Sequence, residues 1–346
     1  MKKLSFTPRI LLSCFAGAVL AGLVGCKNNE YTPCGYFISE TETSVVCANG
    51  FGEAIPIKKN PQRTIVLQNS LLDLWYLSGG KAIARVSGKE NVPAAAEKLT
   101  IVGGRAAPGV EKIVSLSPDL IIMSATGTTR KMSTIFNQNN IQSFAVEYNN
   151  YPEFLDLLSV FAKINGTENQ FIRIAENISN SVRRIIDKCP DKGNPRTLVF
   201  FLTTKSVQCQ TDYALTANMV RMLKGINVIK PESGYRTYVS YSLEKIADLN
   251  PELVLVAAMG DPGKCRQRLE KDVLSSPVWR AVHAGKNNRI HFLPNELFLF
   301  KPNGRFPEAF LYLASLMYPD SFNSENKSGN YNTPAEEKVK NHVSED

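Results

Sequence analysis

The sequence lacks most of the motifs that enzymes and metal sites require. Only three of its 346 residues are histidines, and the first of them is His283. A bare zinc or manganese site, built from histidines and carboxylates of two halves of a protein, is therefore not expected. No CxxC pair occurs, which excludes a zinc ribbon and a thioredoxin motif. GxSxG, HExxH and Walker motifs are also absent, so the sequence does not indicate a serine hydrolase, a zinc protease or an ATPase.

Charge and hydropathy exclude two further classes. The formal net charge is +8, and it falls to +5 when the three cations of residues 1–25 are removed, because that segment holds no acids. No run of lysine and arginine is dense enough for a nucleic-acid track. Only one segment is apolar enough to enter a membrane, which excludes a polytopic permease.

That segment begins the chain and has the pattern of an export signal. A short basic start precedes Ile10–Gly25, sixteen apolar or small residues, whereas a spanning helix needs roughly 20. The run ends in Leu23-Val24-Gly25-Cys26, which resembles the bacterial lipobox. We therefore expect cleavage before Cys26 and lipidation of this cysteine, which would anchor the protein at a membrane surface. The expected location is the periplasm or the outer face of the cytoplasmic membrane.

Five cysteines remain for the folded domain, and disulfides are permitted in this compartment. Cys34 and Cys47 are close enough in sequence to cross-link the N-terminal extension. An odd number leaves at least one thiol free or paired between chains, and the pairing stays open. The five are Cys34, Cys47, Cys189, Cys209 and Cys265.

An internal repeat is the most informative feature of the chain. Glu111–Leu120 and Glu244–Leu253 match at Glu, Lys, Ile, Leu, Pro and Leu, 133 positions apart. Each copy predicts a short helix, a turn at proline and a strand buried on both faces. A strand is likewise expected at 63–67 and a helix at 71–77, and the irregular segment before them contains one candidate strand around 45–57. Two such copies predict two α/β lobes of similar build.

A long helix is predicted between the copies. Residues 168–188 form an uninterrupted helical pattern after a break at Gly166-Thr167. Thr167 and Gln170 have the spacing of a capping box. A helix of this length spans roughly 30 Å, enough to join two lobes. Trp75 and Trp279 lie in apolar helical patterns and are expected in the core.

The chain resembles the helical-backbone (class III) substrate-binding proteins of ABC importers, which deliver ferric siderophores, haem, cobalamin or metal ions. The resemblance rests on Pro61–Val66, on both repeats, on Ser276–Val282 and on Asn288–Pro294. It implies two Rossmann-like α/β lobes joined by a single long rigid helix, with the ligand cleft between them. The expected divisions are a signal peptide at 1–25, an extension at 26–60, an N-terminal lobe at 61–150, a helical linker at 151–190, a C-terminal lobe at 191–320 and a disordered tail at 321–346.

The resemblance also implies functional residues. In this family one glutamate on each lobe docks against arginines of the permease, and the repeats map these to Glu111 and Glu244. Siderophore-binding members carry an arginine at the position of Arg105, where it contacts the ferric chelate. The expected ligand-binding residues lie on loops after strand ends; they are Gln68, Asn69, Arg105, Thr126, Tyr148, Tyr235, Arg236, Tyr238 and Phe298.

The resulting hypothesis is a lipid-anchored, monomeric receptor that captures an iron–siderophore complex and delivers it to a permease and its ATPase. It has no cofactor or resident metal of its own and no nucleic-acid partner. The same receptor for a corrinoid or for haem is an alternative, since a tyrosine can ligate haem iron. A secreted two-lobed enzyme and a structural lipoprotein or adhesin are alternatives of other classes.

Overall fold

The computed structural model describes residues 35–231 and 234–322. The predicted signal peptide, Cys26, Cys34 and residues 323–346 of the predicted tail lie outside the described residues. Within the described ranges, no helix combines the length and the apolar character needed to cross a bilayer.

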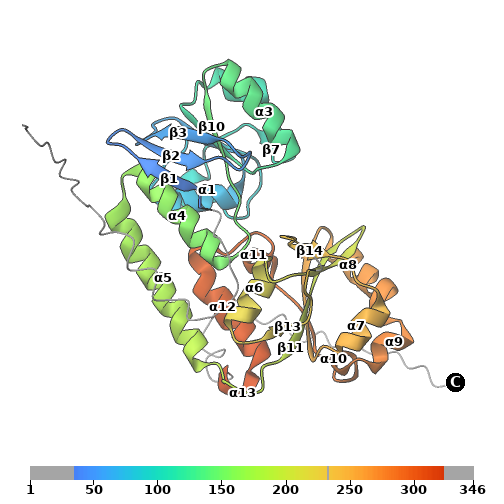
Figure 1. The fold of residues 1–346 in the computed structure, drawn as a ribbon. Coiled ribbons are helices and arrows are strands. Elements are labelled where there is room, and N and C mark those ends of the chain that lie inside the picture. Colours follow the sequence, from blue (N-terminus) through green and yellow to red (C-terminus); the bar gives the residue numbers. More distant parts are fainter. Residues whose placement is uncertain (1–34, 232–233, 323–346) are drawn as a thin grey trace, which may run out of the picture. The chain divides into compact units, whose positions relative to one another are not determined.

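The first lobe is built on a parallel five-stranded sheet with the order β10-β9-β4-β5-β6 (Figure 1). Its helices are short, and a small hairpin follows β6. The strands are β4 (Thr64–Val66), β5 (Ala84–Arg85), β6 (Thr100–Ile101), β9 (Leu120–Met123) and β10 (Gln142–Ala145); the hairpin is β7 (Gly103–Gly104) and β8 (Ala107–Pro108); the helices are α1 (Asn69–Leu77), α2 (Val110–Ser115) and α3 (Gly127–Gln138). The strand predicted at 63–67 is confirmed, and the helix predicted at 71–77 begins two residues earlier.

The second lobe is a mixed sheet with the order β14-β12-β11-β15-β16, in which β13 also pairs with β11. Strand β12 runs antiparallel to β11, while β15 and β16 continue in parallel. The strands are β11 (Arg196–Thr203), β12 (Val207–Gln210), β13 (Ile226–Asn227), β14 (Tyr238–Val239), β15 (Leu253–Met259) and β16 (Ile290–Phe292); the helices are α6 (Leu215–Met222), α7 (Leu243–Leu249), α8 (Pro262–Leu269), α9 (Pro277–Ala281), α10 (His283–Lys286) and α11 (Asn295–Phe298).

Helices α4 (Tyr151–Asn165) and α5 (Glu168–Lys188) join the lobes, and α12 (Phe306–Met317) packs along α5, ahead of α13 (Pro319–Phe322) (Figure 1). Gly166 takes the left-handed conformation, with φ of 64°, that ends α4. The predicted capping box at Thr167 is wrong. The hydroxyl of Thr167 donates instead to the carbonyl oxygen of Ser78 at 2.5 Å, which ties the start of α5 to the first lobe.

Both repeats form the predicted helix, turn and strand. Helix α2 precedes β9, and α7 precedes β15. The residue before each repeat proline adopts a left-handed conformation, with φ of 46° at Ser117 and 41° at Asn250. This conformation ends each helix and redirects the chain into the following strand.

One apolar cluster runs through the linker into both sheets. In the first lobe Val66 belongs to it, whereas its neighbour Ile65 faces a separate cluster under α3. In the second lobe Val199 belongs to it, whereas Leu198 faces the cluster under α7 to α9. Both sheets are therefore covered on both faces, as the continuous apolar runs predicted. Trp75 and Trp279 are buried, as expected.

The N-terminal extension is more ordered than the sequence indicated. In place of an irregular segment with a possible strand around 45–57, β1 (Phe37–Glu40), β2 (Ser44–Ala48) and β3 (Ala54–Lys58) form an antiparallel sheet. The turn between β2 and β3 interrupts what would have been a single strand.

The described cysteines are all free thiols in buried positions: Cys47, Cys189, Cys209 and Cys265. Burial raises the pKa of Cys47 and of Cys209 to about 12, so both stay protonated at neutral pH.

Candidate ligand-binding site

The first lobe contributes residues at the carboxyl edge of its parallel sheet. The loops after β4, β9 and β10 all begin at this edge, which is where α/β sheets bind ligands. They carry Gln68 and Asn69, Thr126, and Glu147 with Tyr148. These three segments begin at the same edge of the sheet, and their side chains make different contacts.

Gln68 and Asn69 lie at the start of α1. The amide nitrogen of Gln68 donates to the Ser70 hydroxyl at 2.8 Å, which occupies one end of this side chain. The amide nitrogen of Asn69 reaches the carbonyl oxygen of Ser87 at 3.4 Å. The Asn69 Oδ1 atom is buried and has no hydrogen-bond partner among the residues that the structure describes.

Arg105 occupies the two-residue turn between β7 and β8. Its side chain is exposed and makes no hydrogen bond or ion pair with any residue that the structure describes. Thr126 differs, because its hydroxyl caps α3 and accepts from the main-chain N–H of Thr129 at 3.2 Å. The Thr126 hydroxyl therefore already has a structural role.

Tyr148 and Phe298 are placed in the core. Tyr148 has no exposed surface, and its hydroxyl donates to Asn303 Oδ1. Burial and the Asp73 carboxylate raise the pKa of Tyr148. Phe298 is 5% exposed and packs on Tyr312, with 5.8 Å between ring centroids. Neither ring is presented to a ligand in this structure, so both predicted contacts lack an accessible surface.

Lys301 is a residue that sequence reasoning missed. Its ammonium lies 4.0 Å from the centroid of the Tyr148 ring and donates to the Tyr148 carbonyl oxygen. Burial lowers its pKa to about 8, while the carboxylates of Glu147 and Glu153 act in the opposite direction. Nothing in the local sequence distinguishes this lysine, since it is brought to Tyr148 from 153 positions away.

The second lobe presents two exposed tyrosines toward these carboxylates. Tyr235 is 51% exposed, and its hydroxyl donates to Glu153 Oε1 at 3.1 Å. Tyr238 is 38% exposed, and burial of its hydroxyl together with the Glu147 carboxylate raises its pKa. Each ring packs at a tilted angle against another aromatic ring, Tyr235 against Tyr213 at 4.5 Å and Tyr238 against Phe201 at 4.7 Å between centroids.

We expected these tyrosines to follow the carboxyl end of a parallel strand, and this expectation is wrong. They lie in edge strand β14 and in the segment that leads into it. Gln68, Thr126 and Tyr148 of the first lobe follow parallel strands, whereas Tyr235 and Tyr238 lie at the edge of the second sheet. The reason is the antiparallel strand β12, which places β14 at that edge.

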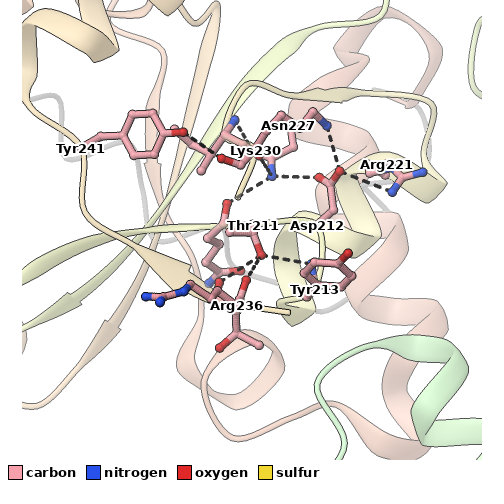
Figure 2. A network of polar contacts seen from close by, with 11 residues as sticks. Thr211, Asp212, Tyr213, Arg221, Asn227, Lys230, Arg236 and Tyr241 are labelled. Carbon is pink, nitrogen blue, oxygen red and sulfur yellow. Dashed lines mark hydrogen bonds and ion pairs between the residues drawn. The ribbon is translucent and has the colours of Figure 1, made fainter. Parts of the chain in front are cut away.

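A polar network around Thr211 and Asp212 joins the segment after β12 to the segment before β14 (Figure 2). The Thr211 hydroxyl donates to the Arg236 carbonyl oxygen and accepts from the main-chain N–H of Tyr213 at 3.3 Å. The Asp212 carboxylate accepts from Asn227 at 2.9 Å and from Lys230 at 2.8 Å. The main chain of Arg236 is thereby fixed, while its guanidinium is exposed.

The accessible groups define a chemistry. They are aromatic faces on the second lobe and the exposed side chains of Arg105 and Arg236. Among the described residues, no three His, Cys, Asp or Glu side chains cluster as a metal site would need. Such surfaces suit a ligand that is itself flat or aromatic and carries anionic oxygens.

Glu111 and Glu244 are both exposed in the first turns of α2 and α7. Hydrogen bonds from its own main-chain N–H and from Ser242 lower the pKa of Glu244, so it is ionised at neutral pH. The two carboxylates occupy equivalent positions in the two repeats, as predicted.

Comparisons with known proteins agree with this geometry. The model of the periplasmic binding protein family matches residues 65–297. The high-affinity heme uptake system protein IsdE of Staphylococcus aureus is 25% identical over 226 residues, which cover 63% of this chain and 74% of IsdE. The crystal structure of IsdE complexed with heme has a TM-score of 0.66 at 19% identity, covering 74% of this chain and 98% of that one. The triscatecholate siderophore binding protein FeuA of Bacillus subtilis, complexed with ferri-bacillibactin, has a TM-score of 0.60 at 16% identity, covering 77% and 95%.

Proposed function

The chain belongs to the periplasmic binding protein family, and from this premise we propose that it captures a ferric siderophore and delivers it to an ABC importer. It is a substrate-binding protein of an iron, haem or siderophore importer and not an enzyme. A permease and an ATPase are therefore its partners. Energy for transport comes from that separate ATPase, since the sequence has no Walker motif.

One observation carries the choice of a siderophore. Arg105 on the first lobe and Arg236 on the second both hold exposed guanidiniums, and exposed tyrosines lie beside Arg236. A guanidinium donates paired hydrogen bonds to anionic oxygens such as those of a catecholate or hydroxamate. Capture between the lobes would bring these two cations to opposite sides of one anionic chelate.

Calorimetric titration of the purified chain tests this proposal. The panel contains a ferric tris-catecholate, a ferric tris-hydroxamate, cobalamin, haem and free ferric ion. We expect saturable binding of one ferric chelate, weakened about tenfold by Arg105→Ala, the size expected for a charge-assisted hydrogen bond. Arg105→Lys keeps the charge but loses the fork of donors, so an intermediate affinity is expected.

Arg183→Ala is the matched control, because Arg183 is an exposed arginine on linker helix α5. Equal affinities of the Arg105→Ala, Arg183→Ala and wild-type chains would refute the role of Arg105. Binding of cobalamin alone would retain the receptor and refute the siderophore.

Haem is a second candidate, favoured by the similarity to a heme uptake protein over 226 residues. Tyr238, 38% exposed on the second lobe, is a residue type that can ligate haem iron. If haem is the cargo, Tyr238→Phe should shift the Soret and charge-transfer bands of the complex. Unchanged spectra would exclude Tyr238 as the iron ligand.

The proposal places the protein outside the cytoplasm as a monomer anchored by lipid at Cys26. The basis is the signal-like start of the sequence and its lipobox. Cys26→Ser should release the protein from the membrane fraction and abolish incorporation of radiolabelled palmitate. A membrane-bound, unlabelled wild-type chain would refute the lipid anchor.

A further inference from the structure

We propose that the hairpin turn at residues 49–53 of the N-terminal sheet forms part of the ligand-binding rim and that Phe51 contacts an aromatic iron chelate. This inference rests on the proposed function and names the ligand class of the same site. The family model begins at residue 65, so the sheet of β1–β3 is an addition to the matched region.

The hairpin is fastened to the carboxyl end of β10. The main-chain N–H of Gly50 donates to the carbonyl oxygen of Ala145 at 2.8 Å, and the N–H of Ala145 donates to Asn49 Oδ1 at 3.1 Å. Ala145 is the last residue of β10, and the predicted ligand loop that includes Glu147 follows it. The hairpin therefore sits at the sheet edge where ligands bind.

The hairpin packs so closely against the neighbouring predicted ligand loop that position 50 has room only for glycine. A Cβ atom on Gly50 would lie 2.7 Å from the Cβ of Ala125 and 2.9 Å from the Ala145 oxygen. Ala125 belongs to the loop after β9 that begins α3 and contains Thr126. The hairpin thus contacts two of the loops expected to bind ligand.

Phe51 lies at the tip of this hairpin and is partly exposed. The guanidinium of Arg130, in the first turns of α3, lies 4.6 Å from the centroid of the Phe51 ring. Arg130 also donates to the carbonyl oxygen of Phe51 at 3.0 Å. Phe51 and Arg130 thus form a cation–π pair one helical turn from Thr126, whose carbonyl oxygen accepts from the Arg130 main-chain N–H at 2.9 Å.

The same sheet also positions Glu147. The Tyr36 hydroxyl, just before β1, donates to the Glu147 carbonyl oxygen at 2.7 Å and accepts from its N–H at 2.8 Å. The loop after β10 is therefore held by the added sheet as well as by its own strand. Figure 1 shows β1–β3 just above α4 and to one side of β10 on the first lobe.

The chemistry of the tip specifies the ligand. An aromatic ring stacks on aromatic rings, and a guanidinium attracts anionic oxygens. A catecholate chelate presents both kinds of group, whereas a hydroxamate chelate presents the oxygens alone. We therefore expect Phe51 to favour a catecholate over a hydroxamate.

The test compares two phenylalanine–cation pairs of one sheet. The control pair is Phe37 on β1 and Lys163, whose ammonium lies 4.9 Å from the centroid of the Phe37 ring. Lys163 belongs to the last turn of α4, whereas the loop after β10 leads into the first turn of this helix, so the control pair lies away from the ligand loops. Phe51→Ala, Phe51→Leu and Phe37→Ala are titrated with a ferric tris-catecholate and a ferric tris-hydroxamate. We expect Phe51→Ala to weaken catecholate binding about tenfold, the usual size of an aromatic or cation–π contact, with little effect on the hydroxamate. Phe37→Ala should leave both affinities unchanged.

Phe51→Leu keeps apolar bulk beneath Arg130 and is the variant to use if alanine unfolds the chain. Folded Phe51 variants that bind the catecholate as wild type does would overturn the role of the hairpin while leaving the proposed function intact. An equal loss in Phe37→Ala would overturn it too, since the effect would then belong to the sheet as a whole. A wild-type chain that binds neither chelate overturns the siderophore proposal, and the role of Phe51 falls with it.

Discussion

The guanidinium of Arg196 donates a hydrogen bond of 2.6 Å to the carbonyl oxygen of Leu249, the last residue of α7. In the other lobe Arg63, 133 positions earlier, donates to the carbonyl oxygen of Leu116 at 2.7 Å, just after α2. The main-chain N–H groups of the same two arginines donate to Glu252 and Asp119, which follow the repeat prolines. The duplication therefore includes the support that holds the carboxyl end of each glutamate-bearing helix.

Removing this support should destabilise each lobe. Arg63→Ala and Arg196→Ala should each lower the free energy of unfolding by about 1 kcal/mol, because a charged donor is lost from helix-terminal carbonyl groups but the sites are exposed. Urea denaturation measures this. The control is Arg184→Ala, since within residues 35–231 and 234–322 Arg184 donates only to its own helix, to the Asn180 carbonyl oxygen at 3.3 Å. A control loss as large as that of Arg196→Ala would contradict the assignment.

Exchange of the two exposed repeat glutamates should separate transport from binding. In a chain carrying Glu111→Gln and Glu244→Gln, we expect uptake of the iron chelate to fall at least about tenfold, because the charges that would meet the cations of the permease are gone. The dissociation constant for the chelate should not change. Cellular uptake and calorimetry measure the two quantities.

Glu168→Gln is the control for this experiment, since Glu168 is likewise an acid in the first turn of a helix, α5. Equal loss of uptake in the control, or a parallel loss of chelate affinity in the double variant, would refute docking through Glu111 and Glu244.

The buried ammonium of Lys301 should make stability depend on pH. Burial lowers its pKa from 10.5 to about 8, so between these values the unfolded chain binds more protons at this site than the folded chain. The contribution of Lys301 to the free energy of unfolding therefore rises as the pH increases from about 8 to about 10. Lys301→Met should flatten the measured slope over this range, whereas Lys89→Met, at an exposed position, should retain it. Parallel slopes in urea denaturation of all three chains would show that Lys301 is not buried as described.

The packing of the N-terminal hairpin against Ala125 and the end of β10 can be tested without any ligand. Gly50→Ala places a methyl group 2.7 Å from the Ala125 Cβ, so it should lower the free energy of unfolding by about 1–3 kcal/mol. Gly127→Ala has no atom within 4 Å of its new methyl group and should change stability little. Thermal denaturation compares the two. Equal midpoints for both variants would mean that the hairpin does not pack against β10 as described.

Local patterns were enough to predict much of the fold. The repeats at Glu111 and Glu244 predicted two helix–turn–strand units, because helix starts, prolines and apolar runs act over a few residues. The exposed glutamates followed from the same pattern. The sequence indicated only one strand around 45–57 in place of β2 and β3, because both strands are short and their pairing depends on the turn between them.

The functional surface depends on longer-range contacts. Tyr148 and Tyr235 look alike in sequence, as aromatic residues in polar loops. Tyr148 is fully buried in contact with Lys301 and Asn303, whereas Tyr235 is exposed and hydrogen-bonded to Glu153. The residues that cover Tyr148 lie 153 and 155 positions away in the chain, and a local pattern contains no such information.

The two-lobed α/β class, the duplicated unit and the joining helix follow from the amino-acid pattern, because hydrophobic periodicity and helix-ending residues specify elements wherever they occur. Tertiary packing is responsible for which side chains remain accessible, for the contact of Phe51 with Arg130 and for the lowered pKa of Lys301. Those properties follow from desolvation and from contacts across the chain, which exist only once the elements have packed.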